Sequence, residues 1–83
     1  MRRKETNKKS TPSLYGSVIE LTENRKAVVD GCKFIINYDE NAIEIKLSEM
    51  CVRFIGRDLV MSSLVYNQAV ITGEISGIEF FSI

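Results

Sequence analysis

The sequence of 83 residues contains no histidine and two cysteines. Histidine is the commonest general base near neutral pH and the commonest metal ligand, so its absence excludes a Ser–His or Cys–His nucleophile. Cys32 and Cys51 cannot supply the four ligands of a zinc site, and their separation in sequence predicts two free thiols. The densest carboxylate pair, Asp39 and Glu40, lies in a predicted turn where both side chains ionise in water. We therefore expect no enzyme activity, no cofactor and no metal site.

Glycine-rich loops and long apolar segments are also absent. The five glycines are spread singly along the chain, which excludes a phosphate-binding loop. No stretch approaches the roughly 20 apolar residues that cross a bilayer, and the first residues lack the apolar middle of a signal peptide. We expect a soluble cytoplasmic protein.

Charge is divided sharply between two parts of the chain, although the whole is neutral. The first 13 residues carry a net charge of +4, which leaves −4 on the remainder. We expect a disordered basic tail over residues 1–13 and a single all-β domain over residues 14–83. The tail is either a solvated leader or an attachment to anionic lipid head groups or nucleic acid. The residues that would make this attachment are Arg2, Arg3, Lys4, Lys8 and Lys9.

An alternating apolar pattern over residues 42–55 predicts a β-hairpin. On each side of a polar break at Ser48 and Glu49, apolar side chains recur at every second position. A period of two places them on one face of each strand. The pattern assigns to these faces Ile43, Ile45 and Leu47, followed by Met50, Val52 and Phe54.

Most of the remaining chain after residue 16 also alternates apolar and polar residues, and no segment shows the spacing of an amphipathic helix. Further strands are predicted over residues 17–22, 26–29, 32–37, 59–66, 69–72 and 74–81, with Phe34 and Ile36 on the same face of their strand. Residues 56–58 are predicted to reverse the chain, and a β-bulge is predicted at Ser76 and Gly77, where the apolar period slips. Seven or eight short strands favour an all-β, mainly antiparallel meander that forms a small sandwich or roll. A short β-solenoid-like stack is the alternative, because apolar runs end repeatedly in glycine.

The order of these pieces resembles the YabP/YqfC family of small sporulation proteins. The resemblance is carried by Glu23-Asn24-Arg25 after an apolar strand, Asp39-Glu40 in a turn, and the strand Ile43-Glu44-Ile45-Lys46-Leu47. It continues through Val52-Arg53-Phe54-Ile55-Gly56 with Leu59 three residues on, then Ile71-Thr72-Gly73-Glu74-Ile75 and Gly77-Ile78-Glu79-Phe80. The opening Met1-Arg2-Arg3-Lys4 is similar to the YqfC branch.

The resemblance implies a protein of the mother cell of a sporulating bacterium that contributes to assembly of the spore envelope. It implies a membrane-bound sporulation protein as partner, and a cytoplasmic location that is peripheral at the forespore membrane. It transfers no catalytic residues to this chain.

Protein–protein contact is the function that the residues themselves favour. The C-terminal strand carries apolar residues on both faces, so we expect it to lie at a sheet edge and to pair with a partner protein or a second copy. The candidate contact residues are Tyr66, Phe80 and Phe81. The alternative is a two-layer sandwich that covers both faces of the strand internally.

A β-barrel that binds nucleic acid through the basic tail is the alternative function. The folded body argues against it, because its net charge is negative and because Phe34, Phe54 and Phe80 fall at positions typical of a core. We therefore expect a non-enzymatic sporulation scaffold or adaptor rather than a nucleic-acid-binding protein.

Overall fold

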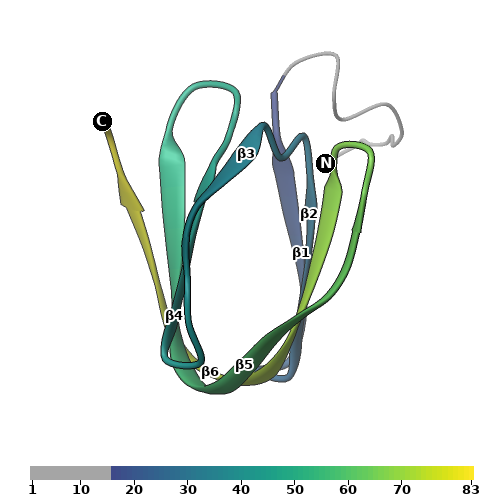
Figure 1. Cartoon of the computed structure of the whole chain (residues 1–83), viewed down its shortest axis with the longest axis vertical. Helices are drawn as coiled ribbons and strands as arrows, with labels where there is room; N and C mark the ends of the chain where they lie inside the picture. Colours follow the sequence, from purple (N-terminus) through teal and green to yellow (C-terminus); the bar gives the residue numbers. More distant parts are fainter. Residues whose placement is uncertain (1–15) are drawn as a thin grey trace, which may run out of the picture.

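The computed structural model describes residues 16–83, and every regular element in them is a β-strand (Figure 1). The strands are β1 (Val18–Thr22), β2 (Lys26–Asp30), β3 (Phe34–Tyr38), β4 (Ala42–Lys46), β5 (Cys51–Val65) and β6 (Gln68–Phe81). They form one antiparallel sheet in the order β1-β2-β6-β5-β4-β3, which confirms the all-β prediction. Within these residues, no helix has the length and apolar character that crossing a membrane requires.

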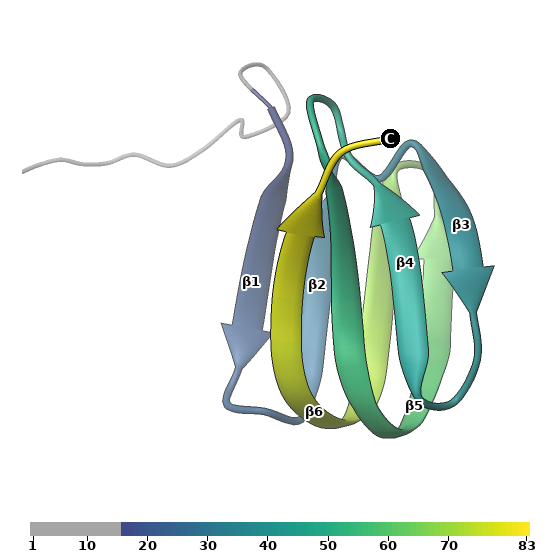
Figure 2. The same cartoon turned by 90° about the vertical axis from the view of Figure 1, so that its left-hand side faces the viewer.

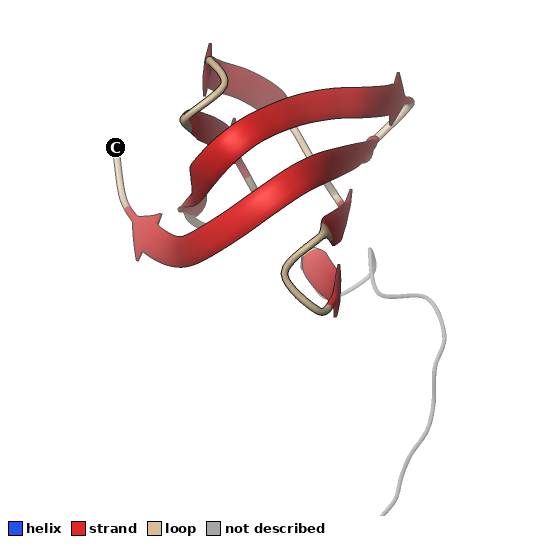
Figure 3. Ribbon diagram, turned by 90° about the horizontal axis from the view of Figure 1, so that it is seen from below, coloured by secondary structure: helices blue, strands red, loops and turns tan. Residues whose placement is uncertain are grey.

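Two long strands fold this single open sheet into two layers. β5 and β6 pair along most of their length, and both curve through the lower part of Figure 1. β2 pairs with residues 68–72 of β6, whereas β4 pairs with residues 51–55 of β5. One layer therefore contains β1, β2 and the hairpin that joins β5 to β6, and the other contains β3, β4 and the far ends of β5 and β6 (Figure 1). Figure 3 views the molecule from below, where the two long strands lie side by side. A sheet folded on itself in this way is a roll.

Backbone conformations that are rare for L-residues allow the bend in β5 and β6. Asp58 has a φ of 54° and Gly73 a φ of 135°. The register shifts here, so that β5 contributes two residues, 58 and 59, opposite Gly73 of β6. Such a bulge bends and twists a strand without ending its pairing. The predicted reversal at residues 56–58 is therefore wrong, and the described residues form six strands rather than seven or eight, because two predicted pairs of short strands are single long ones.

A second irregularity confirms the bulge predicted at Ser76 and Gly77. Ile55 pairs with Gly77 and Gly56 pairs with Ile75, which leaves Ser76 without a cross-strand partner. The Ser76 hydroxyl donates a hydrogen bond of 3.1 Å to the carbonyl of Ile55. The extra residue restores the alternation, so apolar residues on both sides of it pack against the core.

The core lies between the two layers, and the alternating pattern of β4 and β5 builds one side of it. Phe54, the largest fully buried side chain, pairs with Ile43 on one side and Ile78 on the other. Smaller side chains from the other layer complete the core, and they include Ala27, Val29, Ala69 and Ile71. The inward orientation is confirmed for Ile43, Ile45, Leu47, Val52 and Phe54.

Three apolar residues of the predicted strands do not join the buried faces. Met50 lies in the turn between β4 and β5 rather than in the strand. Phe34 is 54% exposed because it lies on the outer face of β3, which is an edge strand. Ile36 is the extra residue of a bulge in β3, and Ile35 packs against the core in its place. The period of two identified a strand here but assigned its faces wrongly.

The two ends of the roll differ in structure. At one end, which we call the bend end, the β1–β2 and β3–β4 turns cap the bend of the long strands. Backbone amides of the bend donate to turn carbonyls in four pairs, which are Ile75 to Asn24, Gly73 to Arg25, Leu59 to Glu40 and Gly56 to Asn41. The opposite end, which we call the hairpin end, holds the β5–β6 turn, the β2–β3 connection and the β4–β5 turn (Figure 1).

Candidate interaction site at the open edge

Two strand edges face each other across the roll, and no described strand lies between them. β1 pairs with β2 alone, and β6 beyond Gly73 pairs with β5 alone. Figure 2 shows β1 beside this second part of β6, which belongs to the other layer. We call the gap between β1 and residues 76–81 the open edge. The predicted edge position is confirmed for this part of β6 and not for its first part, which lies between β2 and β5.

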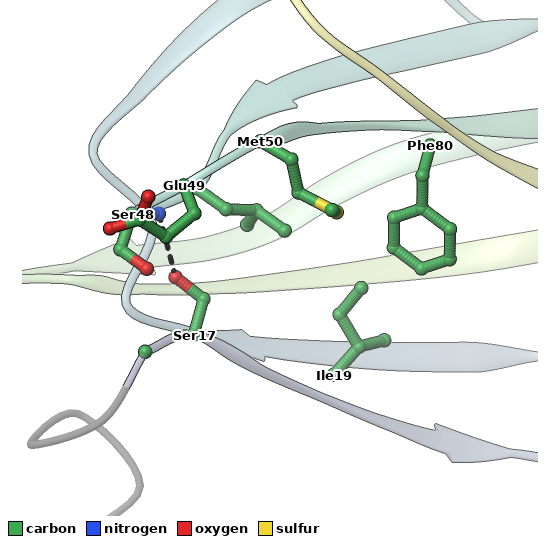
Figure 4. A pocket seen from close by; sticks show the side chains of 8 residues that line it. Ser17, Ile19, Ser48, Glu49, Met50 and Phe80 are labelled. Atoms are coloured by element: carbon green, nitrogen blue, oxygen red, sulfur yellow. Dashed lines mark hydrogen bonds between the residues drawn. The ribbon is translucent and has the colours of Figure 1, made fainter.

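A hollow of about 440 Å³ lies in the open edge toward the hairpin end (Figure 4). Ile19 of β1 and Phe80 of β6 lie on opposite sides of it, and Met50 of the β4–β5 turn lies beside them. Its remaining lining residues are Gly16, Ser17, Leu47, Ser48 and Glu49. The hollow therefore combines an apolar interior with a polar rim.

Phe80 is the largest apolar side chain of the hollow, and it remains 59% exposed. It pairs with Val52, whose side chain is fully buried, so the ring of Phe80 lies on the inner face of its layer. The ring is exposed because none of the described strands covers it from the side of β1. An inward-facing aromatic residue at an unpaired edge is a surface that an added strand would bury.

Ser17 fixes the start of β1 against the hairpin end. Its hydroxyl donates a hydrogen bond of 2.8 Å to the carbonyl of Gly31 and accepts one of 3.0 Å from the amide of Ser48. Gly31 has a φ of 87°, and a Cβ at this position would lie 2.7 Å from the Ser17 hydroxyl oxygen. Glycine is therefore required at position 31 for both conformational and steric reasons.

Replacing Ser17 with alanine is expected to destabilise the protein by about 1 kcal/mol, because two partly buried backbone groups lose their partner. Urea denaturation would measure the change. Ser62→Ala is the control, since the Ser62 hydroxyl donates to the carbonyl of Val70 at an exposed site and its loss should change stability by less than about 0.5 kcal/mol. Equal losses of stability in the two variants would contradict the role of Ser17 as a bridge between Gly31 and Ser48.

The outer face beside the open edge carries a charged row across three strands. The Arg53 guanidinium donates to the carboxylates of Glu44 and Glu79, each at 2.7 Å. These hydrogen bonds, that with Glu44 first, raise the pKa of Arg53 above its ordinary value. The guanidinium carbon also lies 4.8 Å from the ring centroid of Phe81. Phe81 thus packs on the outer face, while Arg53 is already engaged by two carboxylates.

The three predicted contact residues lie in different environments. Phe80 lines the hollow, Phe81 stacks on Arg53, and Tyr66 is fully exposed in the β5–β6 turn. The structure brings Phe80 together with Ile19, and it does not place Tyr66 in the hollow. The role of all three in contact stays a prediction. The predicted attachment residues lie outside the described residues, and they are Arg2, Arg3, Lys4, Lys8 and Lys9.

Sequence reasoning missed Ser17, Ile19 and Met50 as parts of this site. No local signal marks them, because contacts between distant parts of the chain bring them together; the Ser17–Ser48 bond spans 31 positions. The assignment of Phe34 and Phe80 to the core is also wrong, since both are more than half exposed. One of the two arguments against nucleic-acid binding is thereby lost, while the negative charge of the body remains.

Groups suited to metal or redox chemistry are sparse in the described part of the chain. Among residues 16–83, no cluster of three or more Cys, Asp or Glu side chains is placed to hold a metal ion. Cys32 and Cys51 are free and buried. Burial raises the pKa of the Cys32 thiol, which keeps it protonated near neutral pH.

Comparison with known proteins gives one match. The model of the YabP family matches residues 15–82, which is about four fifths of the chain. No curated protein and no solved structure matches the chain.

Proposed function

The chain belongs to the YabP family, a family of sporulation proteins, and from this premise we propose that it is a non-enzymatic scaffold or adaptor in assembly of the endospore envelope. In this proposal the protein acts by protein–protein contact at the open edge. The single observation that carries it is Phe80, an inward-facing aromatic residue that stays 59% exposed beside a stretch of β6 unpaired on one side among the described residues.

Strand addition is the mode of contact that this geometry favours. An extended segment beside residues 76–81 would form main-chain hydrogen bonds with β6, while its alternate side chains would enter the hollow between Ile19 and Phe80. The segment would need apolar residues at every second position, because the interior of the hollow is apolar. It would come from a membrane-bound sporulation protein or from a second copy of this chain.

Replacing Phe80 with serine is expected to weaken this contact about tenfold or more, because burial of a phenylalanine side chain contributes roughly 1.5–3 kcal/mol. The variant would be introduced into the spore-forming host in place of the natural copy, and heat-resistant spores would be counted. We expect fewer spores from a protein that remains folded in thermal unfolding, since more than half of Phe80 is exposed within one molecule.

Phe34→Ser provides a matched control for this experiment. Phe34 is 54% exposed, also on an edge strand, but it lies on the outer face of β3 away from the hollow. The Phe34→Ser variant should form as many heat-resistant spores as the wild type. Wild-type spore numbers with Phe80→Ser would argue against use of the open edge. Sedimentation of the purified parent and of Phe80→Ser distinguishes a second copy from a different partner, because only self-association gives a dimer that the substitution removes.

A further inference from the structure

The hairpin that joins β5 to β6 ends in three consecutive apolar or aromatic residues that point into solvent. Leu64 is 51% exposed, Val65 is 66% exposed and Tyr66 is 100% exposed. We call these three residues the apolar tip. The tip belongs neither to the core nor to the open edge, so nothing in the fold described above accounts for it.

Tyr66 also has an unfavourable backbone conformation. Val65 pairs with Gln68, so Tyr66 and Asn67 form a two-residue turn, in which Tyr66 has a φ of 60°. Glycine or asparagine is the residue that such a position favours, and a bulky residue there is strained. The surrounding structure holds the turn in place, because the carbonyl of Asn67 accepts hydrogen bonds of 2.9 Å from the amides of both Gly31 and Cys32. A strained backbone therefore presents a fully exposed aromatic side chain.

The charges of the molecule are distributed along the same axis. The bend end carries five carboxylates against three basic side chains, which are Glu23, Asp39, Glu40, Asp58 and Glu74 against Arg25, Lys26 and Arg57. At the hairpin end, Lys33 and Lys46 balance Asp30 and Glu49. The bend end is therefore acidic, and the end that holds the apolar tip is not.

The first described residues of the chain lie at the hairpin end. Ser17, near the start of β1, bonds to the carbonyl of Gly31, and the amide of Gly31 in turn donates to the carbonyl of Asn67, beside Tyr66. The sequence before these residues contains five basic residues ahead of position 10. Peripheral membrane binding requires two signals together, and an exposed apolar group and a run of basic residues are two such signals.

We propose that the apolar tip inserts shallowly into an anionic lipid surface, with the Tyr66 ring at the level of the head groups. Tyrosine suits this depth because its ring is apolar and its hydroxyl is polar. The tip is the end of a hairpin closed by a two-residue turn, and it offers less surface than the roughly 800 Å² per partner that a stable protein interface buries. In this orientation the acidic bend end is directed away from the anionic surface. This inference is independent of the proposed contact at the open edge.

Tyr66→Gly separates a lipid contact from a structural role, because the two predict opposite effects. Glycine relieves the strained φ and should raise the melting temperature by a few degrees. The same change should reduce binding of the full chain to phosphatidylcholine vesicles that contain phosphatidylglycerol by about tenfold, since the tip loses its aromatic group. Glu23→Gly is the matched control, because Glu23 has a φ of 49° at the bend end. It should raise the melting temperature without reducing vesicle binding.

A tryptophan at position 66 reports directly on insertion, because the chain contains no other tryptophan. The fluorescence of Tyr66→Trp should shift to shorter wavelength on the anionic vesicles and should be quenched by lipids brominated in the acyl chain. Replacement of Arg2, Arg3, Lys4, Lys8 and Lys9 with glutamine should abolish both effects, and pure phosphatidylcholine should produce neither. Solvent-like fluorescence from vesicle-bound protein, or unchanged vesicle binding of Tyr66→Gly, would overturn the proposal. Loss of self-association without loss of vesicle binding would instead assign the tip to protein contact.

Discussion

Replacing Gly56 with alanine is expected to leave the protein unfolded. A Cβ at this position would overlap the carbonyl oxygen of Glu74 and would lie 3.0 Å from the Cα of Ile75. Both obstacles are backbone atoms of the paired strand, so neither can be relieved by rotation of a side chain. The bend of β5 and β6 would have to open to accommodate one methyl group.

The bend end depends on the same glycine for hydrogen bonds. The amide of Gly56 donates to the carbonyl of Asn41 at 3.0 Å, and the side-chain amide of Asn41 donates to the carbonyl of Gly56 at 3.2 Å. Movement of β5 away from β6 would disturb both bonds. We expect a loss above about 3 kcal/mol, which is comparable with the whole stability of a domain of this size.

Circular dichroism and urea denaturation of Gly56→Ala would test this expectation. Gly77→Ala is the matched control, because Gly77 lies in the same pair of strands and a Cβ there would meet nothing within 4 Å. Its stability should stay within about 1 kcal/mol of the parent. A Gly56→Ala protein with the denaturation midpoint of the parent would contradict the close approach of β5 and β6 at the bend.

Replacing Phe54 with alanine is the other change with a large expected effect. Phe54 is fully buried between the layers and is flanked on its own sheet by Ile43 and Ile78. Removal of a buried phenylalanine ring destabilises proteins by about 3–5 kcal/mol, through lost transfer free energy and the cavity left behind. A small domain has roughly that much stability in total, so the variant should be unfolded at room temperature.

Phe54→Leu is the matched variant for this test. It keeps most of the buried volume, and it should remain folded with a loss of about 1–2 kcal/mol. Chemical denaturation of the leucine variant and circular dichroism of the alanine variant give the two measurements. A folded Phe54→Ala protein would show that the two layers can close around the missing ring, which would place the main stabilising contacts elsewhere.

The alternating pattern predicted the sheet well where both layers cover it. Ile43, Ile45 and Phe54 face the core as expected, because each of these positions has a neighbouring strand on both sides. Phe80 also faces inward but lies on an edge segment, where one side has no strand among the described residues, whereas Phe34 lies on the outer face of the edge strand β3. Periodicity assigns residues to faces, but it carries no information about whether another strand covers a face.

The bend shows a second limit of sequence reasoning. Glycine and aspartate with a positive φ are typical both of a turn that reverses the chain and of a bulge that bends a strand. Asp58 and Gly73 were therefore consistent with two short hairpins as well as with one long bent hairpin. The choice between them depends on pairing between β5 and β6 across the bend, which is a long-range contact. The C-terminal strand was predicted to lie at an edge, but the position of β1 across from that edge follows from the bend and could not be predicted for the same reason.

The bent pair of strands has a consequence for how the molecule folds. Because β5 and β6 each run through both layers, neither layer is a unit that could form while the other is absent. β6, the last strand, completes both layers. Most native contacts therefore join residues far apart in the chain, and such a topology folds slowly. Unfolding should accordingly be all-or-none, and slow amide exchange should extend with similar protection through both arms of the long hairpin.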